Sequence, residues 1–303
     1  MNKILIVTGG AGFVGSNLIE YLINRSSYKI ISLDDYSSGS KKNHIRNKKA
    51  TYLKGHTKDI NKILNKYKSK IDTIFHFGEF SRIYQSFNQM NKCIQSNTIG
   101  TNAVFDFCLK NKIKLIYSAT SATLGNKGKD KNLSPYAFTK FKNIEFLENL
   151  KKWFNFKYDV IFFYNVYGPK QICKGKMATV IGIFEDCYLR GKALPVVKPG
   201  NQTRRFTHIK DTIEVCYNAW KKNRCKYYSI SNKESFSILE VAKLFKSKIK
   251  FLKKRKGERF ASALTDLSLS NKVHKNFGKI HLRKYIEEFL KNNEKKQILR
   301  NKR

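Results

Sequence analysis

The 303-residue chain has few acidic residues, no long apolar run and no closely spaced pair of cysteines. No segment approaches the roughly 18 apolar residues of a membrane-spanning helix, and Met1-Asn2-Lys3 leads into glycines too early for a signal peptide. We therefore expect a cytoplasmic protein without a membrane segment. The six scattered cysteines indicate neither a metal site nor a disulfide framework. A hydrophobic content of 41% still allows a sizeable core.

The shortage of acidic residues leaves a formal net charge of +39, from 61 Lys and Arg against 22 Asp and Glu. A basic stripe of such strength is typical of proteins that bind nucleic acids. Lysines nevertheless occur in nearly every segment of this chain, which favours a solvated surface of biased composition. We expect no specific nucleic-acid partner, and only weak non-specific binding at low salt.

Short apolar strands alternate with amphipathic helices through the first half of the chain. The expected elements are strands at 3–8, 29–33, 51–53, 73–77 and 114–117, and helices at 16–23, 60–67 and 97–109. This alternation predicts an α/β fold with a Rossmann-type, doubly wound parallel sheet. Ligand chemistry is then expected at the carboxyl ends of the strands.

The first predicted strand ends in a glycine pattern typical of dinucleotide-binding sites. Gly9, Gly12 and Gly15 suit the tight turn, the close approach of a pyrophosphate and the close packing of helix on sheet. Asp34 ends the second strand, at the spacing expected for a carboxylate that accepts the adenosine ribose hydroxyls. Because this carboxylate would repel the 2′-phosphate of NADP, the pattern predicts NAD as the cofactor.

A second motif places a phenol and an amine on one face of a predicted helix. Ser134 can cap this helix and Pro135 suits its first turn, so Tyr136 and Lys140 share a face. An ammonium group beside a phenol lowers the pKa of the phenol, which makes Tyr136 a candidate general base. Taken alone, this spacing also fits an exposed Tyr/Lys pair without a function.

Together these motifs resemble the extended short-chain dehydrogenase/reductases that act on nucleotide sugars, of the UDP-glucose 4-epimerase type. The resemblance extends over nearly the whole chain, with its motifs in order. Besides the glycine loop, Asp34 and Tyr136-x-x-x-Lys140, it rests on His76-Phe77-Gly78, Asn97-Thr98-Ile99-Gly100-Thr101, the segments 118–125, 164–169 and 204–211, Arg255-Lys256-Gly257-Glu258 and Thr265-Asp266.

The resemblance implies epimerisation at C4 of a nucleotide sugar, most simply a UDP-sugar, through a transient 4-keto intermediate. Thr120 stands at the position of the catalytic hydroxyl, with Ser118 and Ser121 as alternatives, while Tyr136 would take the 4-hydroxyl proton and Lys140 would hold the nicotinamide ribose. The implied cofactor contacts are Gly9, Gly12, Phe13, Val14, Gly15, Asp34, Asp35, Phe77, Gly78, Asn97, Tyr136 and Lys140. The implied substrate contacts are Asn165, Arg204, Arg255, Ser262 and Ala263.

The resemblance also implies two domains and a homodimer. Residues 1–165 plus about 206–234 would form the NAD-binding domain, and about 166–205 plus 235–303 a smaller α/β domain for the nucleotide sugar. In the dimer, the helix that carries Tyr136 and the helix before it would pack against a twofold mate. The apolar residues expected on that surface are Phe105, Phe107, Leu109, Phe141, Ile144, Phe146 and Leu147.

Several positions depart from the family pattern or bear on the substrate. His56 takes the place of an aspartate that bonds the adenine, and Ser81 takes that of a lysine that touches the cofactor, with Arg82 as an alternative for that contact. The side chains at Ser262 and Ala263 are small, so the resemblance implies a pocket open to an N-acetyl group at C2 of the sugar.

Two alternative functions stay open at this point. Dehydratases and decarboxylating relatives carry an acidic residue directly after the catalytic hydroxyl or one further on, where this chain has Ser121 and Ala122. A non-catalytic NAD-binding protein with nucleic-acid affinity would keep the glycine loop, but it would have no reason to keep Thr120, Tyr136 and Lys140 together. The residue pattern favours the epimerase.

Overall fold

The computed structural model describes residues 3–124, 130–254 and 273–301, with side chains up to residue 294. The strands are β1 Ile4–Thr8, β2 Lys29–Asp34, β3 Ala50–Lys54, β4 Ile71–His76, β5 Lys114–Thr120, β6 Tyr158–Phe163, β7 Asn165–Tyr167, β8 Leu194–Val197, β9 Thr203–His208, β10 Tyr227–Ser231, β11 Ser235–Ser237, β12 Ile249–Leu252 and β13 Val273–Phe277. The α-helices are α1 Phe13–Arg25, α2 Ile60–Leu64, α3 Ile83–Asn88, α4 Met90–Ile94, α5 Thr101–Lys110, α6 Pro135–Phe154, α7 Val180–Leu189, α8 Ile209–Lys222, α9 Ile238–Leu244 and α10 Leu282–Asn301. Short 3-10 turns are η1 Lys41–Asn43, η2 Thr57–Asp59, η3 Asn65–Lys70 and η5 Ser121–Thr123, and the π-helical turn η4 spans Gln95–Gly100.

Eight parallel strands form the large sheet, in the order β13-β10-β6-β5-β4-β1-β2-β3. The predicted Rossmann-type parallel sheet is therefore confirmed, and the five predicted strands correspond to β1 to β5. The winding reverses direction between β1 and β4, which leaves a crevice at the carboxyl ends of these two strands. This crevice is where the functional site lies.

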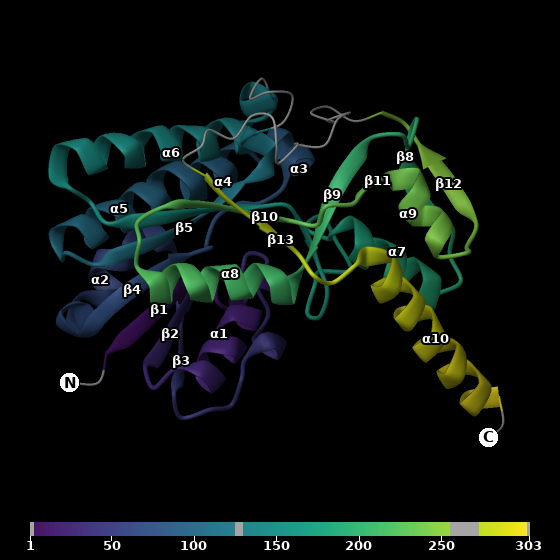
Figure 1. Ribbon diagram of the computed structural model, residues 1–303, viewed down its shortest axis with the longest axis horizontal. Coiled ribbons are helices and arrows are strands. Elements are labelled where there is room, and N and C mark those ends of the chain that lie inside the picture. Colours follow the sequence, from purple (N-terminus) through teal and green to yellow (C-terminus); the bar gives the residue numbers. More distant parts are fainter. Residues whose placement is uncertain (1–2, 125–129, 255–272, 302–303) are drawn as a thin grey trace.

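Helices cover both faces of the large sheet (Figure 1). α1 presents Leu18, Ile19, Leu22 and Ile23 at helical spacing, and these side chains are buried against the sheet together with Trp220 of the neighbouring α8. α5 and α6 cover the opposite face, where their apolar side chains share a core with β4, β5 and β6. Fully burying one such aliphatic side chain contributes about 1.5–3 kcal/mol, so each face of the sheet is firmly held.

The apolar residues expected on the dimer surface largely serve this core instead. Phe105, Phe107, Ile144 and Leu147 are buried, so the prediction that they form an exposed surface is wrong. The reason is that α5 and α6 pack against the sheet and against neighbouring helices, which leaves less free apolar surface than their sequences indicate. The large exposed apolar side chains of α4, η4 and α6 are Met90, Ile94, Ile99, Phe138, Trp153 and Phe154.

A smaller part of the molecule holds the sheets β11-β9-β7 and β12-β8 with α7, α9 and α10 (Figure 1). It has its own core, which includes Tyr167, Phe184, Phe206, Phe245 and Ile286. The sequence predicted that residues 235–303 belong to this part, but β13 lies in the large sheet beside β10. The C-terminal third of the chain is therefore shared between the two parts.

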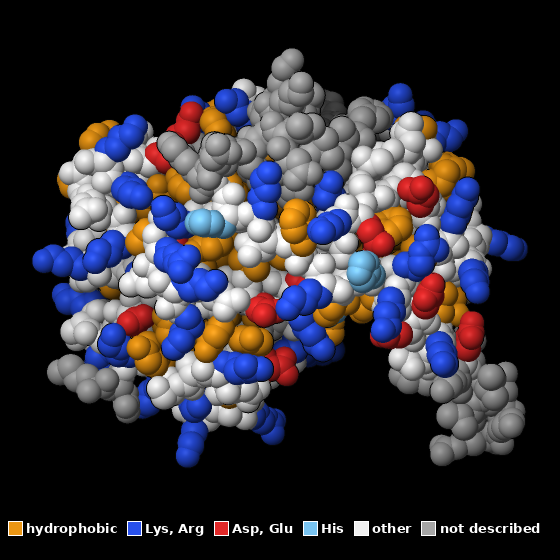
Figure 2. Space-filling model, viewed as in Figure 1, with side chains coloured by type: hydrophobic (Ala, Val, Ile, Leu, Met, Phe, Trp, Pro, Cys, Tyr) orange, Lys and Arg blue, Asp and Glu red, His pale blue; other side chains and the backbone are white. Residues whose placement is uncertain are grey.

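The face of the molecule seen in Figure 2 is basic without a single basic stripe among its described residues. Figure 2 shows Lys and Arg side chains over the whole visible face, on the large part and on the small part alike. Within the described residues, no helix combines the length and apolar character needed to cross a bilayer. The distribution in Figure 2 fits a charged surface of biased composition better than a dedicated nucleic-acid face.

Candidate active site

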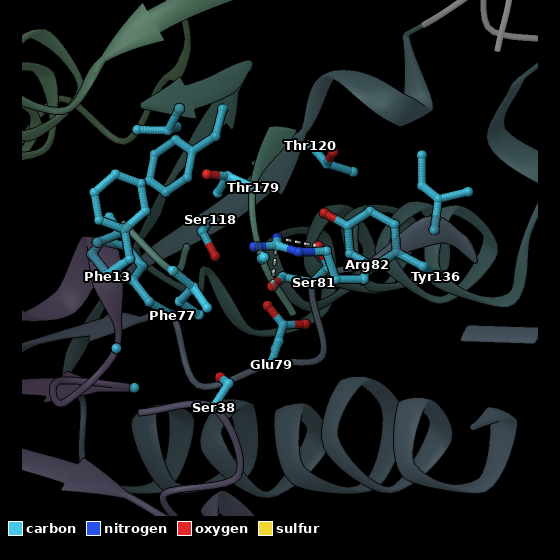
Figure 3. Close-up of a pocket in the computed structure, with 18 of the residues that line it drawn as sticks. Phe13, Ser38, Phe77, Glu79, Ser81, Arg82, Ser118, Thr120, Tyr136 and Thr179 are labelled. Atoms are coloured by element: carbon cyan, nitrogen blue, oxygen red, sulfur yellow. Dashed lines mark hydrogen bonds between the residues drawn. The ribbon is translucent and has the colours of Figure 1, made fainter. Parts of the chain in front are cut away.

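A cavity of about 610 Å³ lies at the carboxyl ends of β1, β4 and β5 and extends to the smaller part of the molecule. Figure 3 shows the side chains that enter it from both parts. Of the predicted site residues that the structure describes, all except Asn97 line this cavity. They are Gly9, Gly12, Phe13, Val14, Gly15, Asp34, Asp35, Phe77, Gly78, Thr120, Tyr136, Lys140, Asn165 and Arg204.

The glycine loop, from the end of β1 into the first turn of α1, has no room for a side chain at Gly9 or at Gly15. Gly9 has a φ of +68°, and a Cβ atom there would lie 2.8 Å from the carbonyl oxygen of Phe77. A Cβ atom at Gly15 would lie 2.2 Å from the carbonyl oxygen of Gly9. α1 begins at Phe13 with no acidic residue in its first turn, so its N-terminus attracts an anion. The loop fits the pyrophosphate of a dinucleotide.

Asp34 lies at the end of the cavity where the adenosine ribose of such a dinucleotide is expected. Its carboxylate is nearly buried and accepts the backbone N–H groups of Ala11 at 2.9 Å and Tyr36 at 2.8 Å. Burial raises the pKa of Asp34, and these two hydrogen bonds oppose that effect. Each carboxylate oxygen keeps a lone pair for a ribose hydroxyl. His56, at the predicted adenine position, also lines the cavity.

The N-terminus of α6 forms as its local sequence predicts. Ser134 Oγ accepts the backbone N–H of Ala137 at 3.1 Å, and Pro135 occupies the first turn. Tyr136 and Lys140 lie one turn apart, are 8% and 3% exposed, and both line the cavity. The helix therefore presents the phenol and the amine to the same cavity, and Figure 3 shows the phenol of Tyr136 there.

Thr120, the last residue of β5, lines the same cavity. Its Oγ1 accepts the backbone N–H of Ala122 at 3.2 Å, a bond that does not use the hydroxyl hydrogen. The hydroxyl of Ser118, by contrast, donates to the carbonyl oxygen of His76 at 3.0 Å. Because the hydrogen of Ser118 is already engaged, the geometry favours Thr120 over Ser118 as a hydroxyl donor into the cavity, which Ser121 also lines.

A buried carboxylate outside the predicted set, Glu79, follows β4 and lines the cavity (Figure 3). Lys140 Nζ donates to Glu79 Oε2 and to the carbonyl oxygen of Ser118. The side chain of Lys140 is only 4% exposed and that of Glu79 only 2%. Burial raises the pKa of Glu79 and lowers that of Lys140, while the ion pair opposes both shifts.

The second oxygen of Glu79 is equally well occupied. Glu79 Oε1 accepts the hydroxyl of Thr101 at 3.0 Å, the hydroxyl of Tyr117 at 3.1 Å and the side-chain amide of Asn143 at 3.3 Å. Sequence reasoning missed this residue, although an acidic side chain directly after the motif His76-Phe77-Gly78 is a visible signal in a chain with so few.

His76 joins this network to β1. Thr8 Oγ1 accepts the backbone N–H groups of Phe77 at 3.1 Å and Gly78 at 3.0 Å, so its own hydrogen goes to His76 Nδ1 at 2.7 Å. His76 Nε2 then carries the ring hydrogen and donates to Thr101 Oγ1 at 3.0 Å. Burial lowers the pKa of His76 to about 3, which keeps the ring neutral. This buried, fully bonded histidine is suited to packing rather than to proton transfer with a substrate.

Asn97, a predicted cofactor contact, is fully buried and does not line the cavity. Its side chain accepts the backbone N–H of Phe80 at 2.7 Å and donates to the carbonyl oxygen of the same residue at 3.0 Å. Asn97 therefore holds the backbone directly after Glu79. It shapes the cavity wall from behind instead of touching a ligand.

Two predicted substrate contacts lie on the wall formed by the smaller part. Asn165 donates its side-chain amide to the carbonyl oxygen of Arg205 at 2.9 Å. Arg204, on β9, is 9% exposed and donates to the carbonyl oxygen of Thr203 at 2.8 Å. Lys176 adds a further positive charge to the cavity lining. The other predicted substrate contacts, Arg255, Ser262 and Ala263, lie outside the described residues.

Arg82 connects the two parts of the molecule at the cavity. Its Nε and Nη2 atoms donate to the carbonyl oxygen of Met177 at 3.0 and 2.5 Å, and Nη1 donates to the carbonyl oxygen of Ser81 at 2.9 Å. The guanidinium also interacts electrostatically with Tyr136. Arg82 is therefore a second cation near the phenol, in addition to Lys140, and its predicted contact with the cofactor stays a prediction.

The sequence matches the model of the NAD dependent epimerase/dehydratase family over residues 5–230. The chain belongs to this family, and its cofactor is NAD. The residues present fit that cofactor, since the glycine loop leaves space for a pyrophosphate and Asp34 offers its carboxylate to a ribose. The predicted family and cofactor are thereby confirmed.

Similar proteins are named for different reactions. The chain is 29% identical over 261 residues to a protein of Methanocaldococcus jannaschii provisionally named UDP-glucose 4-epimerase, covering 82% of this chain and 83% of the relative. It is 27% identical over 277 residues to UDP-glucuronic acid decarboxylase 6 of Arabidopsis thaliana, covering 82% and 75%. The structure of UDP-N-acetylglucosamine 4-epimerase from Methanobrevibacter ruminantium M1, in complex with UDP-N-acetylmuramic acid, superposes with a TM-score of 0.81 at 25% identity, covering 96% and 97%.

Proposed function

We propose that this protein is a 4-epimerase of a nucleotide sugar, with a UDP-sugar as its substrate. The observation that carries the proposal is that Thr120, Tyr136 and Lys140 line one cavity with the glycine loop, while Ser121 and Ala122 follow Thr120. A phenol, a hydroxyl donor and a cation around one carbonyl-forming carbon can handle the proton and the developing charge when an alcohol is reversibly oxidised, with bound NAD as the hydride acceptor.

Each of the three side chains has a separate part in this reaction. Tyr136 takes the proton of the sugar 4-hydroxyl, and Thr120 donates a hydrogen bond to the same oxygen as negative charge develops on it. The charge of Lys140 favours the phenolate form of Tyr136. When bound, NAD supplies a reversible acceptor for the hydride of C4. Tyr136 returns the proton to the 4-oxygen once the keto sugar has turned its other face toward the cofactor site and C4 has regained the hydride.

Because the keto sugar must rotate within the site, the enzyme has to hold the substrate by its nucleotide rather than by the sugar ring. The wall formed by the smaller part supplies suitable groups, because Arg204 and Lys176 are cations and Asn165 offers an amide. A diphosphate between sugar and nucleoside would meet these cations. The relatives named as acting on UDP-sugars support UDP as the nucleotide, and the small side chains at Ser262 and Ala263 favour a sugar with an N-acetyl group at C2.

The presence of Glu79 in the cavity does not favour a dehydratase or a decarboxylase. Those reactions need an acidic residue that can move a proton at another carbon or position a carboxylate. Both oxygens of Glu79 already accept hydrogen bonds from protein groups, namely Lys140, Thr101, Tyr117 and Asn143. Glu79 is therefore committed to the protein rather than to a sugar.

The proposal is tested by incubating the purified protein with UDP-glucose, UDP-N-acetylglucosamine and UDP-glucuronic acid and following the sugars by proton NMR. We expect the C4 epimer of at least one sugar to accumulate to equilibrium, with UDP-N-acetylglucosamine turned over at least as well as UDP-glucose. Formation of a 4-keto-6-deoxy sugar or of a decarboxylated sugar, without a C4 epimer, would assign the chain to another branch of its family.

We also propose that the protein forms a homodimer through the exposed apolar side chains around α4, η4 and the N-terminus of α6. Met90, Ile94, Ile99 and Phe138 are 50%, 39%, 47% and 46% exposed. Exposed apolar side chains on a highly charged surface favour association with a second copy. Light scattering at micromolar concentration should report twice the mass of one chain, and Phe138→Glu should shift it toward the monomer.

A further inference from the structure

The described residues contain two lysine–carboxylate pairs in which both partners are buried, and only one of them lies at the cavity. Lys140 and Glu79 line the cavity, whereas Lys114 and Asp159, 2.6 Å apart, lie at the opposite ends of the strands. Burying an ion pair costs desolvation energy on both groups, so a pair is not expected at a site unless its geometry serves a purpose there. The pair at the cavity involves the lysine that acts on Tyr136.

We propose that Glu79 is a positioning residue that keeps Lys140 charged and fixed beside Tyr136, so that the acidity of the Tyr136 phenol depends on Glu79. The inference rests on the proposed function, which gives Tyr136 its role as the base. Glu79 acts through Lys140, and no contact with the sugar is required of it.

The hydrogen-bond pattern indicates that Glu79 is a carboxylate and not a carboxylic acid. Lys140 donates to one oxygen, and Thr101, Tyr117 and Asn143 donate to the other. A protonated Glu79 would have to donate a hydrogen where it now receives one. Four donors around one carboxylate stabilise its charged form, which in turn stabilises the charge on Lys140.

The network also fixes the position of Lys140 relative to the cofactor loop. It runs from Thr8 on β1 through His76 on β4 and Thr101 on α5 to Glu79, and from there to Lys140 on α6. Every step joins buried side chains on different elements. The amine of Lys140 therefore has little freedom to move, and it lies in the cavity lining one helical turn from Tyr136.

Among the described residues, the titratable groups that act on the pair or on its neighbour Tyr136 are His76, Cys93, Tyr117, Tyr136 itself and Arg82. Burial lowers the pKa of His76 to about 3 and raises that of Cys93 to about 11, and it raises the pKa of Tyr117 well above its ordinary range. These three groups are uncharged near neutral pH, so Lys140, Glu79 and Arg82 supply the charges.

The sign of the expected effect follows from the burial of Lys140. With its carboxylate partner, the amine stays protonated and lowers the pKa of Tyr136. Without that partner, desolvation lowers the pKa of Lys140, the amine becomes neutral at a lower pH, and the pKa of Tyr136 rises. If Glu79 merely screened Lys140, removal of its charge would lower the pKa of Tyr136 instead.

Glu79→Gln is the informative variant, because glutamine keeps the shape and one acceptor oxygen. When that oxygen accepts from Thr101 and Tyr117, the amide nitrogen faces Lys140 and cannot accept its proton. Glu79→Asp keeps the charge on a shorter side chain. Asp159→Asn is the matched control, since it removes the carboxylate of the other buried pair and leaves the cavity untouched.

Two readouts that require no sugar test the inference. The ionisation of Tyr136 is obtained from the ultraviolet difference between each protein and its Tyr136→Phe counterpart across pH, and the NAD dissociation constant is obtained by titration. We expect Glu79→Gln to raise the Tyr136 midpoint by about one pH unit and to weaken NAD binding roughly tenfold. We expect Glu79→Asp to restore most of the midpoint and Asp159→Asn to leave it unchanged.

An unchanged or lowered Tyr136 midpoint in Glu79→Gln would overturn the inference. These results are independent of the proposed function, because a protein that epimerises no sugar can still show them. Should Glu79→Gln fail to fold, thermal unfolding of Lys140→Met and of the double variant Glu79→Gln/Lys140→Met decides the matter. The double variant is expected to melt above Lys140→Met, and a lower melting temperature would contradict a charged pair.

Discussion

The two buried ion pairs lie at opposite ends of the strands of the large sheet, one at their amino ends and one at their carboxyl ends, and the two pairs have different neighbours. At the amino ends of the strands, Lys114 of β5 pairs with Asp159 of β6. Their other hydrogen bonds are to the backbone, because Lys114 donates to the carbonyl oxygen of Ala219 and Asp159 accepts the N–H of Lys226. At the carboxyl ends, Glu79 meets side chains from α5, β5 and α6 and borders a cavity.

This difference separates an ion pair that holds the fold from one that serves a site. A pair bonded to the backbone fixes neighbouring segments and has nothing further to act on. A pair bonded to a phenol, a hydroxyl group and an amide beside a cavity can pass its charge state to a ligand. The same chemistry, a lysine with a carboxylate, therefore has different consequences at the two ends of the strands.

The largest expected effect concerns Tyr136→Phe, which changes the cavity but neither ion pair. Loss of the hydroxyl removes the proposed base, so turnover should fall at least about 10³-fold, within the usual range of general base catalysis. The melting temperature and the NAD content should stay close to those of the wild-type protein. Steady-state kinetics and calorimetry check both statements, and near-normal turnover would refute the assigned mechanism.

Asp159→Asn breaks the pair at the amino ends of the strands. It leaves Lys114 buried without its counter-ion, and such a change lowers the free energy of unfolding by about 3–5 kcal/mol. Denaturant unfolding measures this loss. Turnover and NAD affinity at a temperature where the variant is folded should match the wild type, and a substantial change in either would show that the two ends of the strands are coupled.

Much of the site could be predicted from the sequence because it depends on short spacings. The glycine loop, the position of Asp34 after β2 and the helical spacing of Tyr136 and Lys140 each involve one or two adjoining elements. Glu79 could not be interpreted in this way, since its partners lie at positions 101, 117, 140 and 143 and meet only in the folded chain.

The surface was harder to predict than the site. Helical periodicity shows that α5 and α6 have apolar faces, but it does not say how many of these faces the sheet and the neighbouring helices cover. Phe105 and Ile144 illustrate this point, because both lie in the core. The pairing of β13 with β10 in the large sheet was also not predictable from local sequence, because pairing between strands far apart in the chain leaves no local sequence pattern.

Asp34→Ala tests the cofactor end of the cavity, away from both pairs. Removal of the carboxylate takes away its hydrogen bonds to the adenosine ribose, and NAD binding should weaken by about 1.5–3 kcal/mol. The change should leave the pKa of Tyr136 unaffected, which distinguishes it from Glu79→Gln. Titration with NAD and with NADP checks the assignment, and unaltered NAD affinity would contradict it.

The smallest expected effect is the loss of stability at acid pH that comes from buried His76, at the carboxyl end of β4. The pKa of His76 is lowered to about 3 in the folded protein, against 6.5 in an unfolded chain, so unfolding takes up a proton below that upper value. The free energy of unfolding should therefore fall by about 1.5 kcal/mol from this residue between pH 6.5 and pH 5. Denaturant unfolding across pH should show this loss, and His76→Asn should reduce it.

The reaction itself is tested most directly by a sugar that carries deuterium at C4. UDP-N-acetylglucosamine or UDP-glucose labelled at this carbon is incubated with the protein, and the position of the label is read by NMR and mass spectrometry. If hydride leaves and returns to the same carbon while Tyr136 moves the hydroxyl proton, the C4 epimer keeps its deuterium at C4. Loss of the label to water, or its appearance at C6, would contradict 4-epimerisation as the function of this site.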